Sequence, residues 1–466
     1  MSFATTGLLE PERLGCSTAA LRGEPPSRVA VLGLGYVGLP TALALFAAGA
    51  AVLGLDTSHD RLHAIRAGEV DLLPADCRRL AAALGLRPAD DHGARPAAEP
   101  GSRPATGGDG ARFALGDDPA ALAAADDVLI CVPTPVDAHR TPDLDALRSA
   151  CATVVAAARP GQTILLTSTS YVGSTRDLLA RPLVERGLVP GRDLHVAFSP
   201  ERIDPGNTAH PPERVPRVVG GCTAACAEHA ARVLRLFAPV VHEVSSAEAA
   251  EMTKLYENTF RAVNIALANE MAEIARRLGL DVMEVIGAAA TKPYGFMPFR
   301  PGPGVGGHCI PCDPHYLLWQ LRARQTHAPL IAGAMDAIAM RPLRVVERAV
   351  EVLAGCGRSP AGARVLLAGV AYKPGVADTR ESPARVILAE LSRRGALVSY
   401  TDPLVPTLVL PDGTRLDSAP APAPGDLDLV IAHTLHPGHD HGWMAAQGCV
   451  LDATYRLRAA PGRAVV

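Results

Sequence analysis

The chain has 466 residues, a net charge of −3 at pH 7 and ten cysteines. Its length allows two or three domains, and its charge gives no reason to expect nucleic acid or an anionic membrane as a partner. No apolar run reaches the roughly 18 residues that a membrane helix needs, the first residues lack the pattern of a signal peptide, and the scattered cysteines do not form a disulfide framework pattern. We therefore expect a cytoplasmic protein.

The first ordered segment follows a tail, residues 1 to 27, that we expect to be flexible because it has no apolar periodicity. Residues 29 to 40 predict an apolar strand entering a glycine turn, residues 41 to 49 a helix, and residues 51 to 56 a second strand. This is the context in which the G-x-G-x-x-G motif binds a dinucleotide. The alternative is a glycine turn in an ordinary α/β core.

Each residue of this motif has an expected role. Gly33 makes the tight turn, Gly35 lets the backbone approach a pyrophosphate, and Gly38 lets the helix pack closely on the strand. The phosphates would lie at the helix N-terminus. Tyr36 and Val37, inside the motif, are expected to contact the cofactor as well.

Asp56 ends the second strand. A carboxylate there can accept hydrogen bonds from ribose hydroxyls, whereas a 2′-phosphate would bring like charges together. We therefore expect the cofactor to be NAD rather than NADP.

Several later strands end in polar residues. Open α/β sheets bind ligands at the carboxyl ends of their strands, so we expect four of these residues near the site: Thr134, Thr169, Glu201 and Arg202. Glu201 taken alone would be a solvated surface carboxylate, but its place just past a strand makes it a candidate base. Before these strands, residues 59 to 85 predict helix and residues 87 to 110 predict a disordered insertion.

Residues 247 to 278 predict one long helix, because they are rich in Ala, Glu, Leu and Met and contain no Pro or Gly. Lys254 and Asn258 project from one face of this helix. A cation beside an amide could stabilise an oxyanion. A solvated lysine beside an ordinary asparagine is the alternative.

Residues 302 to 316 surround a thiol, Cys309, with glycine-rich backbone that a ligand can approach closely. We expect Gly306 to contact substrate. Asp313 lies four residues after Cys309, so in a helix the thiol and the carboxylate would share one face. A nucleophile would then stand beside a possible base.

Two alternatives remain for this loop. Cys309 and Cys312 could form a redox or zinc pair, but zinc would need two more ligands. Cys222 and Cys226, the other close pair, belong to the start of an Ala-rich helix, so we expect no metal. The second alternative is a Gly-rich loop with an inert cysteine.

From residue 364 the alternation of strands and helices returns. Strands are expected at residues 365–370, 396–402, 428–433 and 449–452. This predicts a second open α/β domain without a second glycine motif. Lys373 and Arg380 follow its first strand and could hold a diphosphate.

Six motifs occur along the chain in a fixed order. They are residues 33–40, residues 133–135, residues 199–207, Lys254 with Asn258, residues 306–309 with Asp313, and residues 372–374 with 380–383. In these motifs the chain resembles the UDP-glucose/GDP-mannose dehydrogenase family over nearly its whole length. The resemblance implies a nucleotide-sugar substrate, NAD, and a homodimer formed through the central helix.

The family's chemistry is a four-electron oxidation of the sugar C6 hydroxyl to the uronic acid through a thioester on Cys309. By the resemblance, Lys254 and Asn258 steady the oxyanion, and a lysine near the thiol would also lower its pKa. Glu201 and Thr134 would serve acid/base chemistry and water positioning. Asp313 would assist as base or orienter.

The resemblance also implies the domain organisation. We expect an α/β protein with two Rossmann-like open parallel sheets joined by a long central helix. The NAD-binding domain would span residues 28 to 240, the helical dimerisation domain with the cysteine loop residues 241 to 355, and the nucleotide-sugar-binding domain residues 356 to 466.

The cysteine loop is most similar to that of the UDP-N-acetylhexosamine 6-dehydrogenase branch. The chain departs from that branch at Cys312, Arg300, Thr167 and Met335, the last standing where a substrate-facing Arg is usual. UDP-glucose or TDP-glucose is therefore an alternative substrate. A two-electron hydroxyacid-type dehydrogenase and a non-catalytic NAD-binding protein are alternatives of other classes, but neither gives Cys309 a role.

Overall fold

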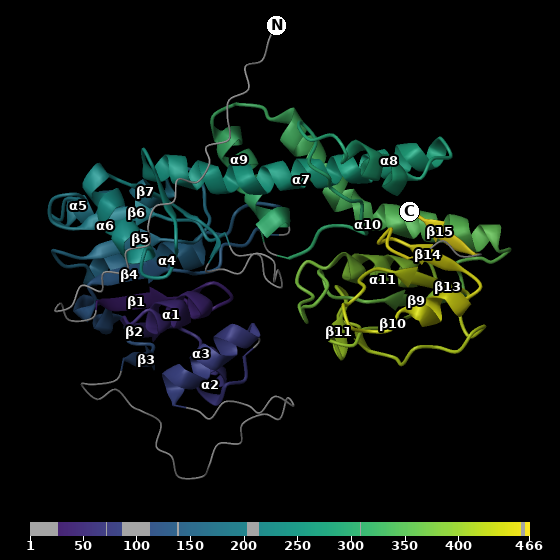
Figure 1. Cartoon of the computed structure of the whole chain (residues 1–466), viewed down its shortest axis with the longest axis horizontal. Helices are drawn as coiled ribbons and strands as arrows, with labels where there is room; N and C mark the ends of the chain where they lie inside the picture. The colour runs from purple at the N-terminus through teal and green to yellow at the C-terminus, as the bar shows by residue number, and fades with distance from the viewer. Residues whose placement is uncertain are drawn as a thin grey trace, which may run out of the picture.

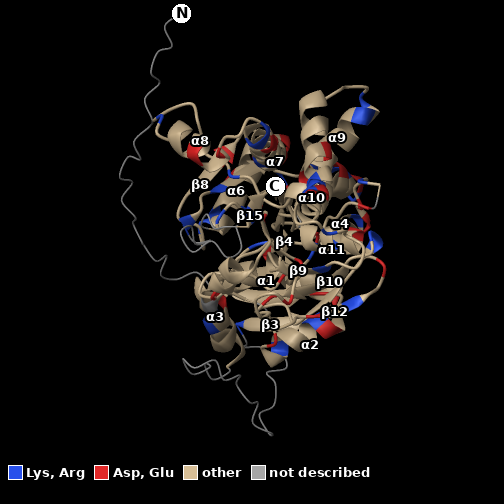
Figure 2. Ribbon diagram, turned by 90° about the vertical axis from the view of Figure 1, so that its right-hand side faces the viewer, with Lys and Arg blue, Asp and Glu red and all other residues tan. Residues whose placement is uncertain are grey.

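The structure is a computed structural model, and it describes residues 27–70, 72–85, 112–137, 139–202, 214–307, 309–457 and 462–466. The insertion expected at residues 87 to 110 and nearly all of the expected N-terminal tail lie outside these ranges. Lys, Arg, Asp and Glu are interspersed over the ribbon (Figure 2), so no single sign of charge dominates this view.

The first sheet has eight strands in the order β3-β2-β1-β4-β5-β6-β7-β8. They are β1 Arg28–Leu32, β2 Ala51–Leu55, β3 Phe113–Gly116, β4 Asp127–Ile130, β5 Thr163–Leu166, β6 His195–Phe198, β7 Arg217–Gly221 and β8 Val241–Val244. All neighbours are parallel except β6 and β7, which are antiparallel. The sheet continues through β8, beyond the boundary expected at residue 240.

The strand register brings the ends of the central strands level. Leu32 pairs with both Leu55 and Ile130, and Ile130 also pairs with Leu166. The loops that follow β1, β2, β4 and β5 therefore leave the sheet at one edge. This is the edge at which open parallel sheets bind their ligands.

Helices cover both faces of this sheet (Figure 1). They are α1 Gly38–Ala47, α2 His59–Ala67, α3 Pro74–Leu84, η1 Pro119–Ala124, α4 Asp145–Ala157, η2 Arg176–Ala180, α5 Arg181–Glu185 and α6 Ala224–Leu234. Side chains alternate between two cores, because Val29 and Val31 pack with α1 and α6 whereas Ala30 packs with α4. Both faces of β1 are thus buried, as in other parallel sheets.

The helical stretch expected at residues 59 to 85 is two helices rather than one. Gly68, with φ of 71°, ends α2 in the left-handed conformation, and Pro74 begins α3. A left-handed glycine stops a helix, and proline is favoured in a first turn.

Four helices form the central part of the chain: α7 Ala247–Arg277, α8 Val282–Ala289, α9 Cys309–Ala323 and α10 Pro329–Gly355. The long helix expected at residues 247 to 278 is confirmed within one residue, and Ser246 caps its N-terminus by accepting a hydrogen bond from the Ala249 N–H. Helix α7 packs against both α9 and α10, and it reaches from the first sheet toward the C-terminal sheet (Figure 1).

The C-terminal sheet has five parallel strands in the order β10-β9-β13-β14-β15. Its elements are β9 Arg364–Ala368, α11 Pro383–Arg393, β10 Leu397–Thr401, β13 Leu429–Ala432, η4 Gly442–Ala446, β14 Val450–Asp452 and β15 Arg463–Val465, with the hairpin β11 Thr407–Val409 and β12 Arg415–Asp417. The predicted fold class, two Rossmann-like open sheets joined by a long helix, is confirmed. Among the described residues, no helix is both long enough and apolar enough to span a membrane.

Candidate active site

The glycine turn after β1 has the geometry of a dinucleotide site. Gly33 has φ of 91°, and a Cβ at Gly38 would lie 1.8 Å from the Gly33 carbonyl oxygen, so both positions exclude a side chain. A Cβ at Gly35 would meet no atom within 4 Å. The backbone at Gly35 therefore faces open space beside the start of α1, and a pyrophosphate fits there.

Asp56, directly after β2, braces this turn. Its Oδ2 accepts a hydrogen bond from the Leu34 N–H at 2.8 Å, and its Oδ1 accepts one from the Ser58 N–H at 2.9 Å. A carboxylate held in this way lies at the strand end where ribose hydroxyls bind in dinucleotide folds. The residues present fit NAD.

The remaining predicted cofactor contacts lie around the same edge. Tyr36 is 46% exposed, and Val37 precedes α1 and packs partly in the core. Thr134 is buried and its hydroxyl interacts with Tyr316 of α9. Thr169 is half-buried in the loop after β5.

Glu201 is buried, so the solvated surface interpretation is wrong for it. Its Oε2 forms an ion pair of 2.7 Å with Arg217, and its backbone carbonyl accepts a hydrogen bond of 2.6 Å from the Lys254 ammonium. The neighbouring Arg202 pairs with Glu257 of α7 at 2.7 Å. The loop after β6 is thus fixed against α7, and Lys254 is a buried cation and not a solvated one.

Asn258, one turn beyond Lys254 on α7, donates a hydrogen bond to Asp313 Oδ2. Asp313 lies on α9 and is 1% exposed. Burial raises the pKa of its carboxyl group to about 6, although the Lys254 ammonium and the Asn258 amide both favour the carboxylate. Two helices therefore bring Lys254, Asn258 and Asp313 together.

Cys309 is the first residue of α9, so it lies one turn before Asp313 on the same helix. The residue is exposed, yet protein atoms around the sulfur desolvate the thiolate and, with the Asp313 carboxylate, raise the pKa of the thiol. The Lys254 ammonium lowers this pKa, but by less than burial and Asp313 raise it. Lys254 thus has the expected lowering effect on the thiol pKa, but burial and the Asp313 carboxylate together raise that pKa above its ordinary value.

The glycines of the cysteine loop pack against the C-terminal domain. A Cβ at Gly306 would lie 2.7 Å from the Tyr372 Cβ, and one at Gly307 would lie 2.9 Å from the Tyr372 ring. The Gly307 N–H also donates to the Arg380 carbonyl at 3.1 Å. These glycines thus permit close contact with the segment after β9, whereas the sequence suggested close approach of a ligand.

Cys312 differs from Cys309 in its surroundings. Both are free thiols, but Cys312 is buried in α9. Within the described residues, no group of three or more His, Cys, Asp or Glu side chains could hold a metal ion.

The two α/β domains meet where Arg380, in the segment after β9, contacts Tyr36, in the turn after β1. The Arg380 guanidinium lies over the Tyr36 ring at 4.4 Å and pairs with Asp378 at 2.7 Å. A guanidinium over an aromatic face is attracted by the ring quadrupole. Arg380 therefore lies beside the cofactor turn, and Lys373, in the same segment after β9, is half-buried.

Two buried charged residues of this region are not predicted by the sequence. Arg217 holds the Glu201 carboxylate. Glu251 on α7 accepts hydrogen bonds from Gly173, Ser174 and Thr175 in the loop that follows Thr169. Charged residues on a strand or helix are exposed by default, so no local signal marks either one.

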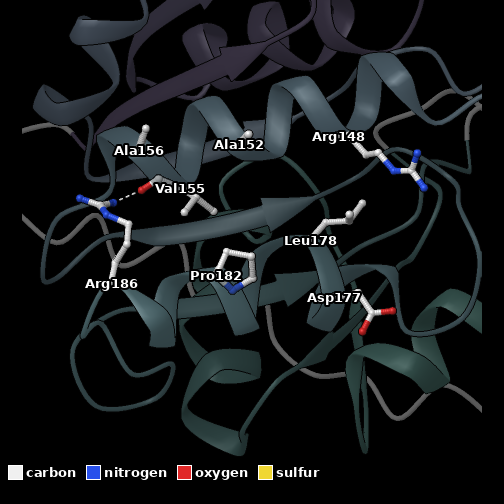
Figure 3. Close-up of a pocket in the computed structure, with 8 residues that line it drawn as sticks. All are labelled: Arg148, Ala152, Val155, Ala156, Asp177, Leu178, Pro182 and Arg186. Atoms are coloured by element: carbon white, nitrogen blue, oxygen red, sulfur yellow. Dashed lines mark hydrogen bonds between the residues drawn. The ribbon is translucent and has the colours of Figure 1, made fainter.

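A hollow of about 520 Å³ lies elsewhere on the first domain. Its lining comes from α4 and from the η2–α5 segment, with Arg148 and Arg186 at its ends (Figure 3). None of its lining residues is a predicted site residue.

Comparisons with known proteins agree with this arrangement. Three models of the UDP-glucose/GDP-mannose dehydrogenase family match the chain: the NAD binding domain at residues 27–84 and 105–241, the central domain at residues 248–337 and the UDP binding domain at residues 366–457.

Individual relatives span most of the chain. A UDP-N-acetyl-D-glucosamine 6-dehydrogenase from Pseudomonas aeruginosa is 32% identical over 88% of this chain and 90% of that protein. A UDP-N-acetyl-D-mannosamine dehydrogenase from Escherichia coli K12 is 33% identical over 78% of this chain and 82% of that protein. The structure of a UDP-D-ManNAc dehydrogenase from Pyrococcus horikoshii has a TM-score of 0.81 and 30% identity, covering 94% of this chain and 98% of that one. The chain therefore belongs to the UDP-glucose/GDP-mannose dehydrogenase family and is an NAD-dependent nucleotide-sugar dehydrogenase.

Proposed function

We propose that the chain oxidises the C6 hydroxyl of a UDP-N-acetylhexosamine to the uronic acid, with Cys309 as the nucleophile. The observation that carries this proposal is the cluster formed by Cys309, Asp313, Asn258 and Lys254 at the junction of α7 and α9. A buried cation, an amide and a carboxyl group beside a thiol are the parts that covalent catalysis on an aldehyde needs.

The protein's part in the chemistry begins with the thiol. NAD, when bound, accepts a hydride in each of two oxidations. Between them the Cys309 sulfur adds to the C6 aldehyde, which gives a thiohemiacetal, and the second oxidation turns this adduct into a thioester. Water then cleaves the thioester, which releases the uronic acid and restores the thiol.

Lys254 stabilises the oxyanion of each tetrahedral adduct. An ammonium has three N–H donors, and the Glu201 carbonyl takes one of them, so others remain for the substrate oxygen. The Asn258 amide donates to Asp313 and thereby orients the carboxyl group next to the thiol. Buried donors cost little reorganisation during the reaction.

Glu201 and Thr134 supply acid/base chemistry and position water. Arg217 fixes the Glu201 carboxylate, and Thr134 is buried beside Tyr316 of α9. Both residues follow strands at the ligand-binding edge of the first sheet. Arg202 and Gly306 border the substrate, while Lys373 and Arg380 hold its diphosphate.

The proposed sugar rests on the relatives named for UDP-N-acetylglucosamine and UDP-N-acetylmannosamine and on the cysteine loop. Met335 is 3% exposed and packs with Val305 and Ile310 beside that loop, so it supports the loop. Arg300 is exposed. UDP-glucose or TDP-glucose is the competing substrate.

The domain limits are part of the proposal: NAD binding from residue 28 through the end of β8 at Val244, the central helices and cysteine loop from there to 355, and nucleotide-sugar binding at 356 to 466. The active form is a homodimer joined along α7. Exposed apolar residues recur along that helix: Met252, Tyr256, Phe260, Leu267, Met271 and Ile274. An apolar stripe of this length on a soluble surface marks an interaction site.

The experiment is a panel of UDP-N-acetylglucosamine, UDP-N-acetylmannosamine, UDP-glucose and TDP-glucose with NAD, read as the rate of NADH formation. One of the two N-acetylated sugars should give the highest kcat/KM. A higher value for UDP-glucose or TDP-glucose would overturn the proposed sugar. Cys309→Ala should abolish turnover, and Cys312→Ala, the matched variant on the same helix, should retain it.

A further inference from the structure

The entry to the cysteine loop is held on both sides of one residue. The Gly302 N–H donates to Asn269 Oδ1 of α7 at 2.9 Å, and the Gly302 carbonyl accepts from Arg341 Nε of α10 at 2.8 Å. Asn269 is 6% and Arg341 2% exposed. Both backbone groups of Gly302 are therefore fixed by buried side chains.

Arg341 makes two further contacts. Its Nη1 lies 3.3 Å from Glu273 Oε1 of α7, and its Nη2 donates to the Tyr455 hydroxyl at 3.4 Å. Tyr455 belongs to the C-terminal domain, and its hydroxyl donates in turn to the Val466 oxygen. One guanidinium thus joins the cysteine loop, α7 and the C-terminal domain.

A guanidinium is suited to this place. It presents five N–H donors in a rigid plane, so it can bond three acceptors in different directions, whereas a lysine ammonium is a compact point charge. Burying a charge is costly, and apolar replacements of buried ion pairs often stabilise proteins. The stability of α10 alone therefore does not account for Arg341.

The described part of the loop between this contact and the thiol, residues 302 to 307, packs against neighbouring elements. A Cβ at Gly304 would lie 2.8 Å from the Pro383 Cγ and 3.5 Å from the Cγ of Pro342, the residue after Arg341. The Gly307 N–H is then bound to the Arg380 carbonyl. The loop is therefore held at several points between Gly302 and Gly307, and Cys309 is two positions further along the chain.

We propose that Arg341 and Asn269 are positioning residues for Cys309, and that Arg341 couples the position of the thiol to the C-terminal domain through Tyr455. The inference rests on the proposed role of Cys309 as nucleophile. If the Gly302 anchor is lost, the thiol no longer stands at a fixed place relative to Lys254 and the substrate. A displacement of about 1 Å can cost roughly 100-fold in rate.

The positioning test compares four variants with the parental enzyme, and a fifth, Tyr455→Phe, tests the coupling. Arg341→Met keeps the length of the side chain and removes all its hydrogen bonds, and Arg341→Lys keeps the charge. Asn269→Ala frees the other side of Gly302. Arg344→Met is the matched control, because Arg344 is on the same helix, is half exposed and pairs with Glu347.

Two readouts are measured for each variant: kcat with the KM values for NAD and sugar, and the rate at which iodoacetamide alkylates Cys309, followed by peptide mass spectrometry. Arg341→Met and Asn269→Ala should lower kcat about 10- to 100-fold and change the alkylation rate. The KM for NAD should stay near the parental value, because the cofactor turn is untouched. Arg341→Lys should have a kcat between those of Arg341→Met and the parental enzyme. Arg344→Met should have the parental kcat and alkylation rate.

Parental kcat and alkylation in Arg341→Met would overturn the proposal. If circular dichroism shows that Arg341→Met does not fold, the test relies on Asn269→Ala. A parental kcat and alkylation rate in Asn269→Ala would then overturn the proposal. Tyr455→Phe tests the coupling: an unchanged kcat contradicts a link to the C-terminal domain. Alkylation needs no turnover, so an active Cys309→Ala enzyme would refute the proposed function while leaving the positioning result valid.

Discussion

Asp313 illustrates how the fold adjusts a single residue. Burial raises the pKa of its carboxyl group to about 6, so the group is neutral below that pH and a carboxylate above it. The carboxylate in turn contributes to raising the pKa of the Cys309 thiol. The two groups are therefore coupled, and the proton lost by Asp313 makes the thiol harder to ionise.

The first prediction concerns this pair. In the parental enzyme kcat should rise as the pH passes through about 6, because the carboxylate is the form that acts as base or orienter. Asp313→Asn should remove that inflection and lower kcat. It should also increase Cys309 alkylation at mildly alkaline pH severalfold, because loss of a negative neighbour lowers the pKa of the thiol.

The measurement is the pH profile of kcat together with that of iodoacetamide alkylation for both proteins. An inflection near the same pH in Asp313→Asn would assign it to another group. Slower alkylation in the variant would contradict the sign of the coupling.

The second prediction concerns Asp56. Its carboxylate braces the Leu34 and Ser58 N–H groups, and a carboxylate at this strand end of a dinucleotide fold would repel a 2′-phosphate. The parental enzyme should have a much higher kcat/KM with NAD than with NADP. Asp56→Ala should reduce this difference in kcat/KM. It should also weaken NAD binding, because the glycine turn loses the hydrogen bonds that brace it. Asp60→Ala, in the first turn of α2, is the control. Equal kcat/KM for the two cofactors in the parental enzyme would refute the assignment.

At the scale of elements, the sequence predicts best where local signals agree. Helix α7 has strong helix formers, no Pro or Gly and a serine cap, so its limits follow from the sequence. The break between α2 and α3 is missed although Gly68 and Pro74 mark it. The apolar periodicity on both sides of this break indicates helix throughout, and it hides the helix-ending signal of the two turn residues.

Helix α10 is not predicted as a separate element. Pro342 lies inside it, and an interior proline is normally read as a helix end. The glycines of the cysteine loop show a second limit. A Gly-rich stretch indicates that something comes close, but only the tertiary structure identifies the neighbour as Tyr372 and Pro383.

In the whole molecule, the candidate site is assembled from loops that follow strands of both sheets and from the helices between the sheets. The sequence names Cys309, Lys254, Asn258 and Asp313 through their motifs, and the structure brings the last three into one cluster with the thiol. The sequence does not identify Arg217 or Arg341, because their partners lie on other elements. Such pairs depend on which loops meet, which the local pattern does not encode.

The third prediction concerns assembly. If the apolar residues of α7 join two copies, Leu267→Glu should convert a dimer to a monomer, because a carboxylate buried without a partner is costly. Leu397→Glu is the control, since Leu397 is 63% exposed on β10, away from α7. Mass is measured by size exclusion with light scattering. A monomeric parental enzyme, or a dimer that survives Leu267→Glu, would contradict the interface.

We propose that the sugar undergoes a four-electron oxidation through Cys309. This proposal is tested most directly by counting the NADH formed for each nucleotide sugar consumed to completion, with the product identified by mass spectrometry. The parental enzyme should form two NADH and one uronic acid for each sugar, and Cys309→Ala should form neither. One NADH per sugar with an aldehyde as product, or parental turnover by Cys309→Ala, would contradict the proposal.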